Sequence, residues 1–290
     1  FALMGKLFND TVSATLGDNK TVFTKFNNPE KNLSNHYEGK VLGEIWGYRV
    51  DGLFASDEEA AEYTSKINQD AVNERILTDK VDPYYRAGDL KFRDLDGDNV
   101  ISKGDDTAYD AGDREIIGNE TPRYMYSFRL GADWNGFDLG IFFQGVGKRD
   151  WYPNYLSTGF WGPYSRAFTS FIPENFMDQC WSEENRDGYF PRFRGYQTFA
   201  GSQLGVNNDR YLQDASYIRL KNLTVGYTLP VLKKVFTKLR VYFTGENLWY
   251  WSPMLKHTKY IDPEAAGGNG NTGMAYNYSR NFSVGVDITF

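Results

Sequence analysis

Cysteine and histidine are scarce in this sequence of 290 residues. The one cysteine, Cys180, cannot form a disulfide within the chain, and its Trp-rich surroundings offer no second thiol. The two histidines, His36 and His257, lie outside any motif that pairs histidine with a helical glutamate or a nucleophilic serine. We therefore expect Cys180 to be a packed bystander and both histidines to be packing residues of loops or of the surface.

Long apolar runs and basic clusters are also missing. No stretch of about 18 apolar residues occurs, which excludes a transmembrane helix. A membrane β-barrel is not excluded, because its alternating strands keep the mean hydropathy low, here -0.57. The net charge of -6 argues against a nucleic-acid partner. The carboxylate pairs Glu183-Glu184 and Asp105-Asp106 do not fix the separation that glycoside hydrolysis requires, so we expect no enzyme.

Aromatic residues, in contrast, make up 17% of the chain, more than a soluble core of this size needs. Such rings suit a membrane-interface girdle or a sugar-binding surface. Several are concentrated in one segment without sustained alternation and are candidates for binding substrate by stacking on sugars or gripping a peptide. Loop packing and contact with a partner protein are the competing interpretations. These candidates are Trp151, Tyr152, Tyr155, Trp161 and Tyr164.

The clearest alternation runs from Tyr124 to Trp134, which is long enough for a membrane-spanning strand. Asn135-Gly136 follows, the dipeptide that a two-residue type I′ turn favours. Alternation then continues from Phe137 to Val146. The sequence therefore predicts an antiparallel hairpin with one face toward lipid. The side chains expected on that face include Phe128, Leu130, Leu139 and Ile141.

Further strands are expected in residues 1–16, 215–229, 239–251 and 282–290. A change of phase at Lys221-Asn222 predicts a β-bulge. The aromatic cluster Trp249, Tyr250 and Trp251 marks where a strand leaves the bilayer. Counted in this way, about six strands span the membrane, too few to close a transport barrel. The outer face of the last strand would carry Phe282, Val284, Val286, Ile288 and Phe290.

Short turns alternate with long loops, and this pattern sets an orientation. Residues 17–122, 147–214 and 252–278 are expected to be extracellular loops, whereas short connections such as Pro230 to Lys238 are periplasmic. Within the first loop, residues 56–77 read as a helix, because Ser56 is a suitable N-cap before three acidic residues.

One motif carries chemistry: residues 94–105 follow the calcium-loop pattern of acids at positions one, three, five and twelve. Asn99 stands where the consensus has glycine, but asparagine tolerates positive φ. Asp105 stands where a bidentate glutamate belongs. We expect a structural Ca²⁺ that holds the loop; an acidic turn without metal is the alternative. The expected ligands are Asp94, Asp96, Asp98, Val100, Ser102 and Asp105.

Four segments carry a family resemblance: residues 37–54 (YEGKVLGEIWGYRVDGLF), 88–98 (GDLKFRDLDGD), 117–124 (IGNETPRY) and 217–223 (YIRLKNL). Together they resemble the SusC/RagA family of TonB-linked outer-membrane transporters. The likeness runs in order along nearly the whole chain. It ends at Phe290, which resembles the terminal aromatic residue that barrel-assembly machinery recognises.

The resemblance implies an all-β fold, in which residues 1–290 form the C-terminal segment of an antiparallel transmembrane barrel of about 22 strands with long extracellular loops. The N-terminal plug and TonB box of the family are not found in this chain, so the N-terminal remainder of the barrel is an expected partner. By resemblance, the further partners are a SusD-like surface lipoprotein, TonB, outer-membrane lipid and a glycan or peptide ligand. The implied location is the outer membrane of a Gram-negative, Bacteroidetes-type bacterium.

Nutrient import is therefore the leading functional hypothesis, with oligosaccharide or oligopeptide as cargo. One alternative is a structural or docking barrel subunit without transport. A second is a secreted carbohydrate-binding β-protein, in which the apolar row of the last strand would have to pack inward.

Overall fold

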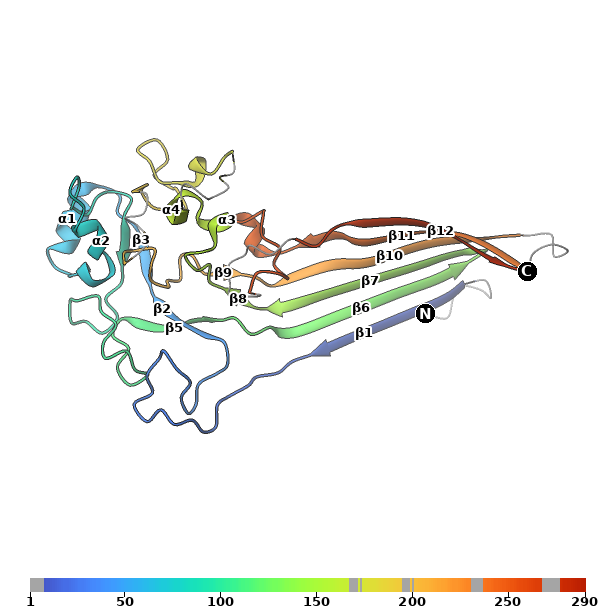
Figure 1. Cartoon of the computed structure of the whole chain (residues 1–290), viewed down its shortest axis with the longest axis horizontal. Coiled ribbons are helices and arrows are strands. Elements are labelled where there is room, and N and C mark those ends of the chain that lie inside the picture. Colours follow the sequence, from blue (N-terminus) through green and yellow to red (C-terminus); the bar gives the residue numbers. More distant parts are fainter. Residues whose placement is uncertain are drawn as a thin grey trace.

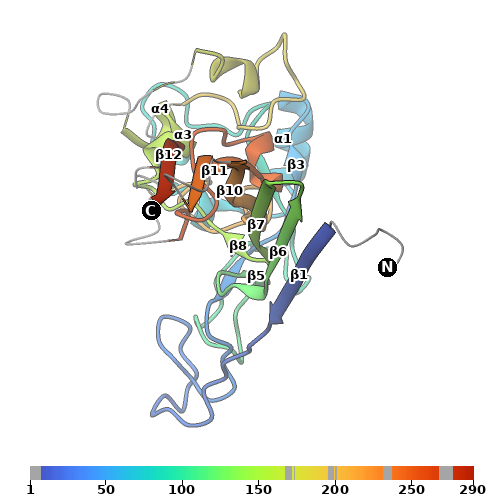
Figure 2. The ribbon, with the colours of Figure 1, turned by 90° about the vertical axis from the view of Figure 1, so that its right-hand side faces the viewer.

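The computed structural model describes residues 8–166, 172, 174–194, 199, 201–230, 237–267 and 277–290. Long antiparallel strands lie side by side in one sheet, and a cap of shorter elements sits at one end of it (Figure 1). Figure 2 looks along the strands from the end away from the cap. In spatial order the described strands of this sheet are β1 (Phe8–Gly17), β6 (Arg123–Trp134), β7 (Phe137–Lys148), β10 (Tyr217–Leu229), β11 (Lys238–Trp251) and β12 (Asn281–Thr289).

β6 and β7 form the predicted hairpin, with Trp134 opposite Phe137. Asn135 and Gly136 make the turn with φ values of 48° and 87°, and a type I′ turn requires positive φ at both positions. The predicted turn is confirmed. Residues directly opposite one another in an antiparallel pair share a face of the sheet. The residues expected to face lipid therefore share one apolar face, through the pairs Phe128–Phe143, Leu130–Ile141 and Ala132–Leu139.

The apolar face continues across the sheet to β12. The register of β10 shifts between Leu220 and Asn222, which confirms the predicted bulge. On β12 the apolar side chains remain uncovered in this structure: Val284 is 77% exposed and Phe282 is 66% exposed. A continuous uncovered apolar face is what a strand presents to lipid. Its members on β11 and β12 are Leu239, Val241, Phe243, Phe282, Val284, Val286 and Ile288.

Aromatic side chains mark both ends of this face. At the cap end, Trp249 and Trp251 lie opposite the apolar residues Leu220 and Ile218 of β10. At the other end, the rings of Phe137 and Tyr227 lie 4.5 Å apart. Amphipathic rings at two levels of one face are typical of the girdles of an outer-membrane barrel.

The opposite face of the sheet is polar. Arg240 on β11 donates to Asp138 on β7 at 2.6 Å and to Asp287 on β12 at 3.0 Å. Its guanidinium crosses the intervening strand β10 over Gly226, where a side chain would collide with Asp138. One arginine thereby connects three strands on the face away from the apolar side chains.

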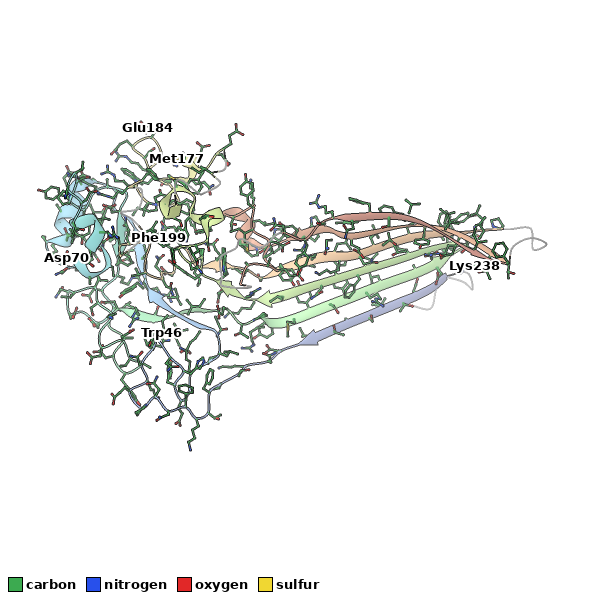
Figure 3. All side chains as sticks on the ribbon, viewed as in Figure 1. Trp46, Asp70, Met177, Glu184, Phe199 and Lys238 are labelled. Atoms are coloured by element: carbon green, nitrogen blue, oxygen red, sulfur yellow. The ribbon has the colours of Figure 1, made fainter. Side chains whose placement is uncertain are left out.

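The described part of the cap is built from the predicted long loops. Its labelled residues Trp46, Asp70, Met177, Glu184 and Phe199 lie far from Lys238, at the opposite end of the sheet (Figure 3). Short strands pair within it: β2 (Glu44–Tyr48) with β5 (Arg114–Asn119), β3 (Val50–Leu53) with β4 (Leu90–Phe92), and β8 (Asp150–Trp151) with β9 (Gln213–Asp214). Its further helices are α3 (Thr158–Trp161), α4 (Pro163–Arg166), η2 (Met177–Gln179) and η4 (Pro253–Lys256).

The prediction of a single helix over residues 56–77 is wrong in its extent. Ser56 does cap it, accepting a hydrogen bond from the Glu59 amide at 3.1 Å. The chain then divides into α1 (Asp57–Thr64), η1 (Asp70–Val72) and α2 (Glu74–Leu77). The break occurs because the backbone of Asn68 pairs with residues 99–101 instead of continuing the helix.

No helix in the described part of the chain is long and apolar enough to cross a membrane. Most of the connection expected at 230–238, the start of the strand expected at 1–16 and part of the loop 252–278 lie outside the described residues.

Gly226 tests the polar-face ion network. In Gly226→Ala, the new Cβ would lie 2.6 Å from the Arg240 Nε, so the arginine must move. We expect a loss of stability of about 1–3 kcal/mol, seen as a lower unfolding temperature of the full receptor in detergent. Gly140→Ala is the matched control on the same face, because the nearest atom to its new Cβ would be 3.9 Å away. Equal unfolding temperatures for the two variants would contradict this role of Gly226.

Candidate functional site

Four of the five aromatic residues proposed for substrate binding are buried in the cap. Trp151, Trp161 and Tyr164 are fully buried and Tyr152 is 7% exposed, whereas Tyr155 is 54% exposed. Trp161 donates its indole N–H to the Pro153 carbonyl at 2.9 Å. Trp151, Trp161 and Tyr164 therefore have no face to offer a ligand in this conformation, whereas Tyr152 lines a pocket beside β2. The structure shows a packing arrangement for Trp151, Trp161 and Tyr164, and substrate contact stays a prediction for Tyr152 and Tyr155.

The buried rings form a common aromatic core with neighbours far along the chain. Trp161 lies edge-on to Phe190, Phe199 and Tyr211, with ring centroids 5.2 to 6.1 Å apart. Edge-to-face contacts at these distances add stability beyond area burial. This core gives the long loop segments of the cap a fixed shape and so positions the pockets on their surface.

Cys180 and the histidines are also packing residues. Cys180 is buried, and burial raises the pKa of its thiol. His257 stacks on Tyr189 at 3.6 Å, and burial lowers its pKa to about 4, so it is neutral at pH 7. His36 stacks on Phe23 at 4.1 Å.

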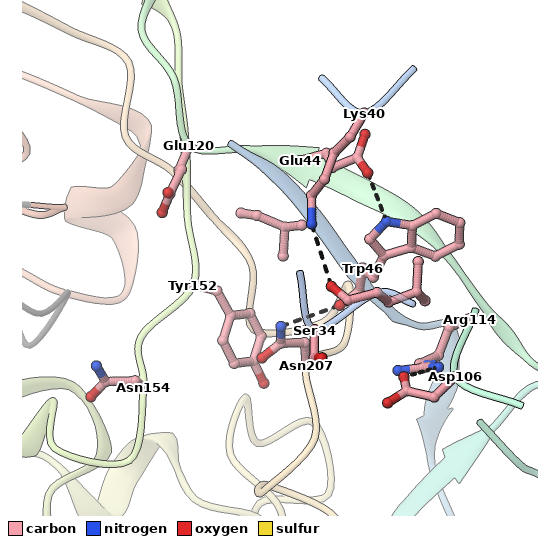
Figure 4. Close-up of a pocket in the computed structure, with 12 residues that line it drawn as sticks. Ser34, Lys40, Glu44, Trp46, Asp106, Arg114, Glu120, Tyr152, Asn154 and Asn207 are labelled. Atoms are coloured by element: carbon pink, nitrogen blue, oxygen red, sulfur yellow. Dashed lines mark hydrogen bonds and ion pairs between the residues drawn. The ribbon is translucent and has the colours of Figure 1, made fainter. Parts of the chain in front are cut away.

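A pocket of the cap with a volume of about 490 Å³ lies beside β2 (Figure 4). It combines a half-exposed indole with amides and charges of both signs. Sequence reasoning singled out only Tyr152 of these residues as a binding candidate, although several others lie within the segments that carry the family resemblance. The polar and aromatic side chains that line it are Ser34, Lys40, Glu44, Trp46, Asp106, Arg114, Glu120, Tyr152, Asn154 and Asn207.

Three charged side chains of this pocket, Glu44, Lys40 and Glu120, have no ion-pair partner among the described residues. Glu44 accepts from the Trp46 indole at 3.0 Å, and Arg114 pairs with Asp106 at 2.7 Å. Lys40 donates only to the backbone carbonyls of residues 33 and 35. The Glu120 carboxylate has no hydrogen-bond or ion-pair partner among the described residues. Of the three, only Glu120 also lacks a side-chain hydrogen bond in the described part of the chain, and the Lys40 ammonium lies over the Tyr37 ring. Lys40 and Glu120 can each still pair with an opposite charge of a ligand.

The acidic loop brings together a different set of carboxylates from the one expected. Oxygens of Asp94, Asp96 and Asp113 lie within 4.8 Å of one another. Oxygens that share a Ca²⁺ ion, each about 2.4 Å from it, can be this far apart, so the set fits such a cation. Asn99 has φ of 65°, so the expected positive φ is confirmed.

Asp98 and Asp105, two expected ligands, are not in this set. Asp98 instead accepts from the Val100 amide at 2.6 Å, and Asp105 is exposed. The chain returns after a detour through residues 103–112, closed by the close approach of Gly104 and Gly112. A linear pattern of twelve residues could not reveal this return.

Asp113 is buried and takes the place expected for Asp105. Its carboxylate accepts from the amides of Leu95 and Ser102, both at 2.7 Å. Burial raises the pKa of Asp113, and the nearby Asp96 and Asp94 carboxylates raise it further. A cation among these three groups would offset both effects.

No protein-family model matches the chain. It is 30% identical over 269 residues to TonB-dependent receptor P3 of Formosa agariphila, and 28% identical over 216 residues to TonB-dependent receptor P26 of the same organism. These alignments cover 87% and 70% of this chain, but only 22% and 20% of the relatives. The chain thus spans about a fifth of the curated relatives it matches.

Solved structures show the same fold. The structure of the RagAB peptide transporter matches 99% of this chain and 28% of its own, with a TM-score of 0.60 at 21% identity. The RagAB peptide importer in the "closed-closed" state matches with a TM-score of 0.57. The all-β class and the likeness stated from the sequence motifs are confirmed. The chain therefore belongs to the TonB-dependent receptors of the SusC/RagA type, as a segment of their β-barrel.

Proposed function

We propose that this chain is part of an outer-membrane importer of oligomeric nutrients in a Bacteroidetes-type bacterium. The single observation that carries this is the long sheet, with an uncovered apolar face, aromatic ends and an ionic opposite face. β1 and β12 each have one partner strand among the described residues, so the N-terminal remainder of the barrel would pair with their other edges. TonB would supply energy through that remainder, and a SusD-like lipoprotein would cover the cap.

Oligopeptide is the cargo that the cap pocket favours over neutral glycan. A peptide carries an N-terminal ammonium, side-chain carboxylates and backbone amides, and the pocket offers Glu120, Lys40 and several amides to match them. A neutral sugar would leave both of these charges without partners. The name of the RagAB structures, a peptide transporter, agrees with this choice.

Other functions are less well supported. The receptor relatives and the uncovered apolar face disfavour a secreted carbohydrate-binding protein. A docking subunit without transport would leave the pocket charges without a ligand. Enzyme activity is not proposed, because the relatives are receptors and transporters.

If the chain imports peptides, removing the charge of Glu120 should lower peptide uptake. In the full receptor, Glu120→Gln should lower uptake of a labelled peptide with a free N-terminus about tenfold or more, since one charge-assisted hydrogen bond is lost. Glu184→Gln, on the cap surface in Figure 3, is the matched control. Uptake by intact cells is measured with and without a protonophore. Protonophore-insensitive uptake, or uptake of neutral glycan but not of peptide, would contradict the proposal.

We further propose that Asp94, Asp96 and Asp113 hold a structural Ca²⁺. The ion would join the two ends of the 94–113 segment and so fix the loop beside β3 and β4. Asp94 supports the loop from within as well, accepting from the amides of Gly97 and Asn99 at 2.7 and 2.9 Å. Hard oxygen ligands suit Ca²⁺, whereas Mg²⁺ demands a tighter octahedral cage.

Calcium should protect this loop in a pH-dependent way. The pKa of Asp113 is raised, so without a cation the loop loses stability as the pH rises and the Asp113 carboxyl ionises. Calcium binds the ionised carboxylates and should therefore stabilise the loop more at pH 7 than at about pH 4.5. Asp96→Asn should remove the protection against proteolysis that millimolar calcium gives. Asp98→Asn should keep this protection. The two variants are matched, because asparagine at either position can still accept the same hydrogen bond from a backbone amide. Identical cleavage of the wild-type receptor with calcium and with a chelator would overturn the site.

A further inference from the structure

A second cavity lies at the cap end of the polar face of the sheet. Its volume is about 440 Å³, enough for roughly one or two amino-acid residues. Ser127 and Gln144 are opposite one another in the β6–β7 register and both line it, as do Met125 and Val146 one step nearer the cap. These side chains belong to the face that carries the Arg240 network, so the cavity opens on the side away from the apolar face.

Arg149 contributes a cation to this cavity that forms no ion pair with any described residue, although the Glu120 carboxylate is near enough to act on its charge. It directly follows β7, and its Nε and Nη1 donate to the carbonyls of Glu120 and Pro263 at 3.3 and 3.4 Å. Both hydrogen bonds are longer than usual. A guanidinium has five N–H donors. The other three donors have no partner among the residues that the structure describes.

The surroundings make this cation costly to leave unpaired. Arg149 is more than half-buried, and burial lowers the pKa of its guanidinium, although it stays charged. Glu264 lines the same cavity, but Lys221 donates to both of its oxygens at 2.8 Å and Arg219 pairs with it at 3.0 Å. Gly267 leaves room beside the guanidinium, where a Cβ would collide with Nη2.

The remaining walls suit a carboxylate that ends a peptide. The Gln144 side-chain amide has no hydrogen-bond partner among the described residues, and Tyr217 lines the same space. Met125, Phe142 and Val146 supply an apolar wall for one side chain. The planar guanidinium fork matches a carboxylate with two parallel hydrogen bonds.

We propose that this cavity binds the C-terminal carboxylate of an oligopeptide cargo, with Arg149 as its charge partner. This inference rests on the proposed import of peptides and adds a site distinct from the pocket beside β2. Gln144 donates a hydrogen bond to the same carboxylate, and the apolar wall receives the last side chain. The cap core and the strand ends hold these groups in place before cargo arrives.

The test compares two peptides of one sequence, one with a free C-terminal carboxylate and one with a C-terminal amide. Calorimetric titration uses the full receptor in detergent. The wild type should bind the free acid at least tenfold more tightly than the amide. Arg149→Gln should remove this preference, and Arg149→Lys should retain part of it. Arg186→Gln, an exposed arginine paired with Glu183 in the cap, should leave it unchanged.

A second variant guards against a folding defect. Gln144→Met removes only the amide and should weaken binding of the acid while leaving binding of the amide peptide unchanged. Equal binding of both peptides to the wild type, or a preference that survives Arg149→Gln, overturns the carboxylate site but leaves peptide import standing. Binding of neither peptide overturns peptide import as well.

Discussion

A strand that crosses a bilayer must hydrogen-bond its backbone to neighbouring strands, because lipid offers no other partners. The rest of this structure follows from that constraint. Pairing fixes the period of two, so side chains divide between two faces. One face collects Val284, Val286 and Ile288, and the other carries Arg240 with its two carboxylate partners. A shift of one residue reverses the faces, and the bulge between Leu220 and Asn222 supplies such a shift. Leu220 and Leu223 therefore lie opposite Phe143 and Ile141 on the same apolar face.

The cap obeys a different rule, because its segments are too long to be ordered by the strands alone. Its aromatic core, centred on Trp161, lets loops separated by many residues pack as one body. A second stabilising contact lies at the cap end of β10, where fully buried Arg219 pairs with Asp262. The Arg219 guanidinium carbon also lies 4.6 Å from the centroid of the Tyr250 ring. Removing one partner of such a buried pair is strongly destabilising. Both features hold the pocket beside β2 and the Arg149 cavity in a fixed shape.

Local rules explain which parts of the structure could be predicted from the sequence. The hairpin at Asn135-Gly136, the bulge and the Ser56 cap each depend on residues within a few positions of one another. The ends of the 56–77 helix could not be found, because Asn68 bonds to a segment about thirty residues away. Asp113 was missed for the same reason, since a detour brings it back to Asp94. The buried aromatic residues looked like a binding surface because composition alone cannot distinguish a core from a platform.

The most direct test of this account is a spin-label scan along β12, from Phe282 to Ile288, in the full receptor in lipid and with Cys180 replaced by serine. Collision rates with oxygen, which concentrates in the bilayer, should alternate with a period of two. The account predicts maxima at Phe282, Val284, Val286 and Ile288. Collision rates without alternation, or with maxima at Ser283, Gly285 and Asp287, would contradict it.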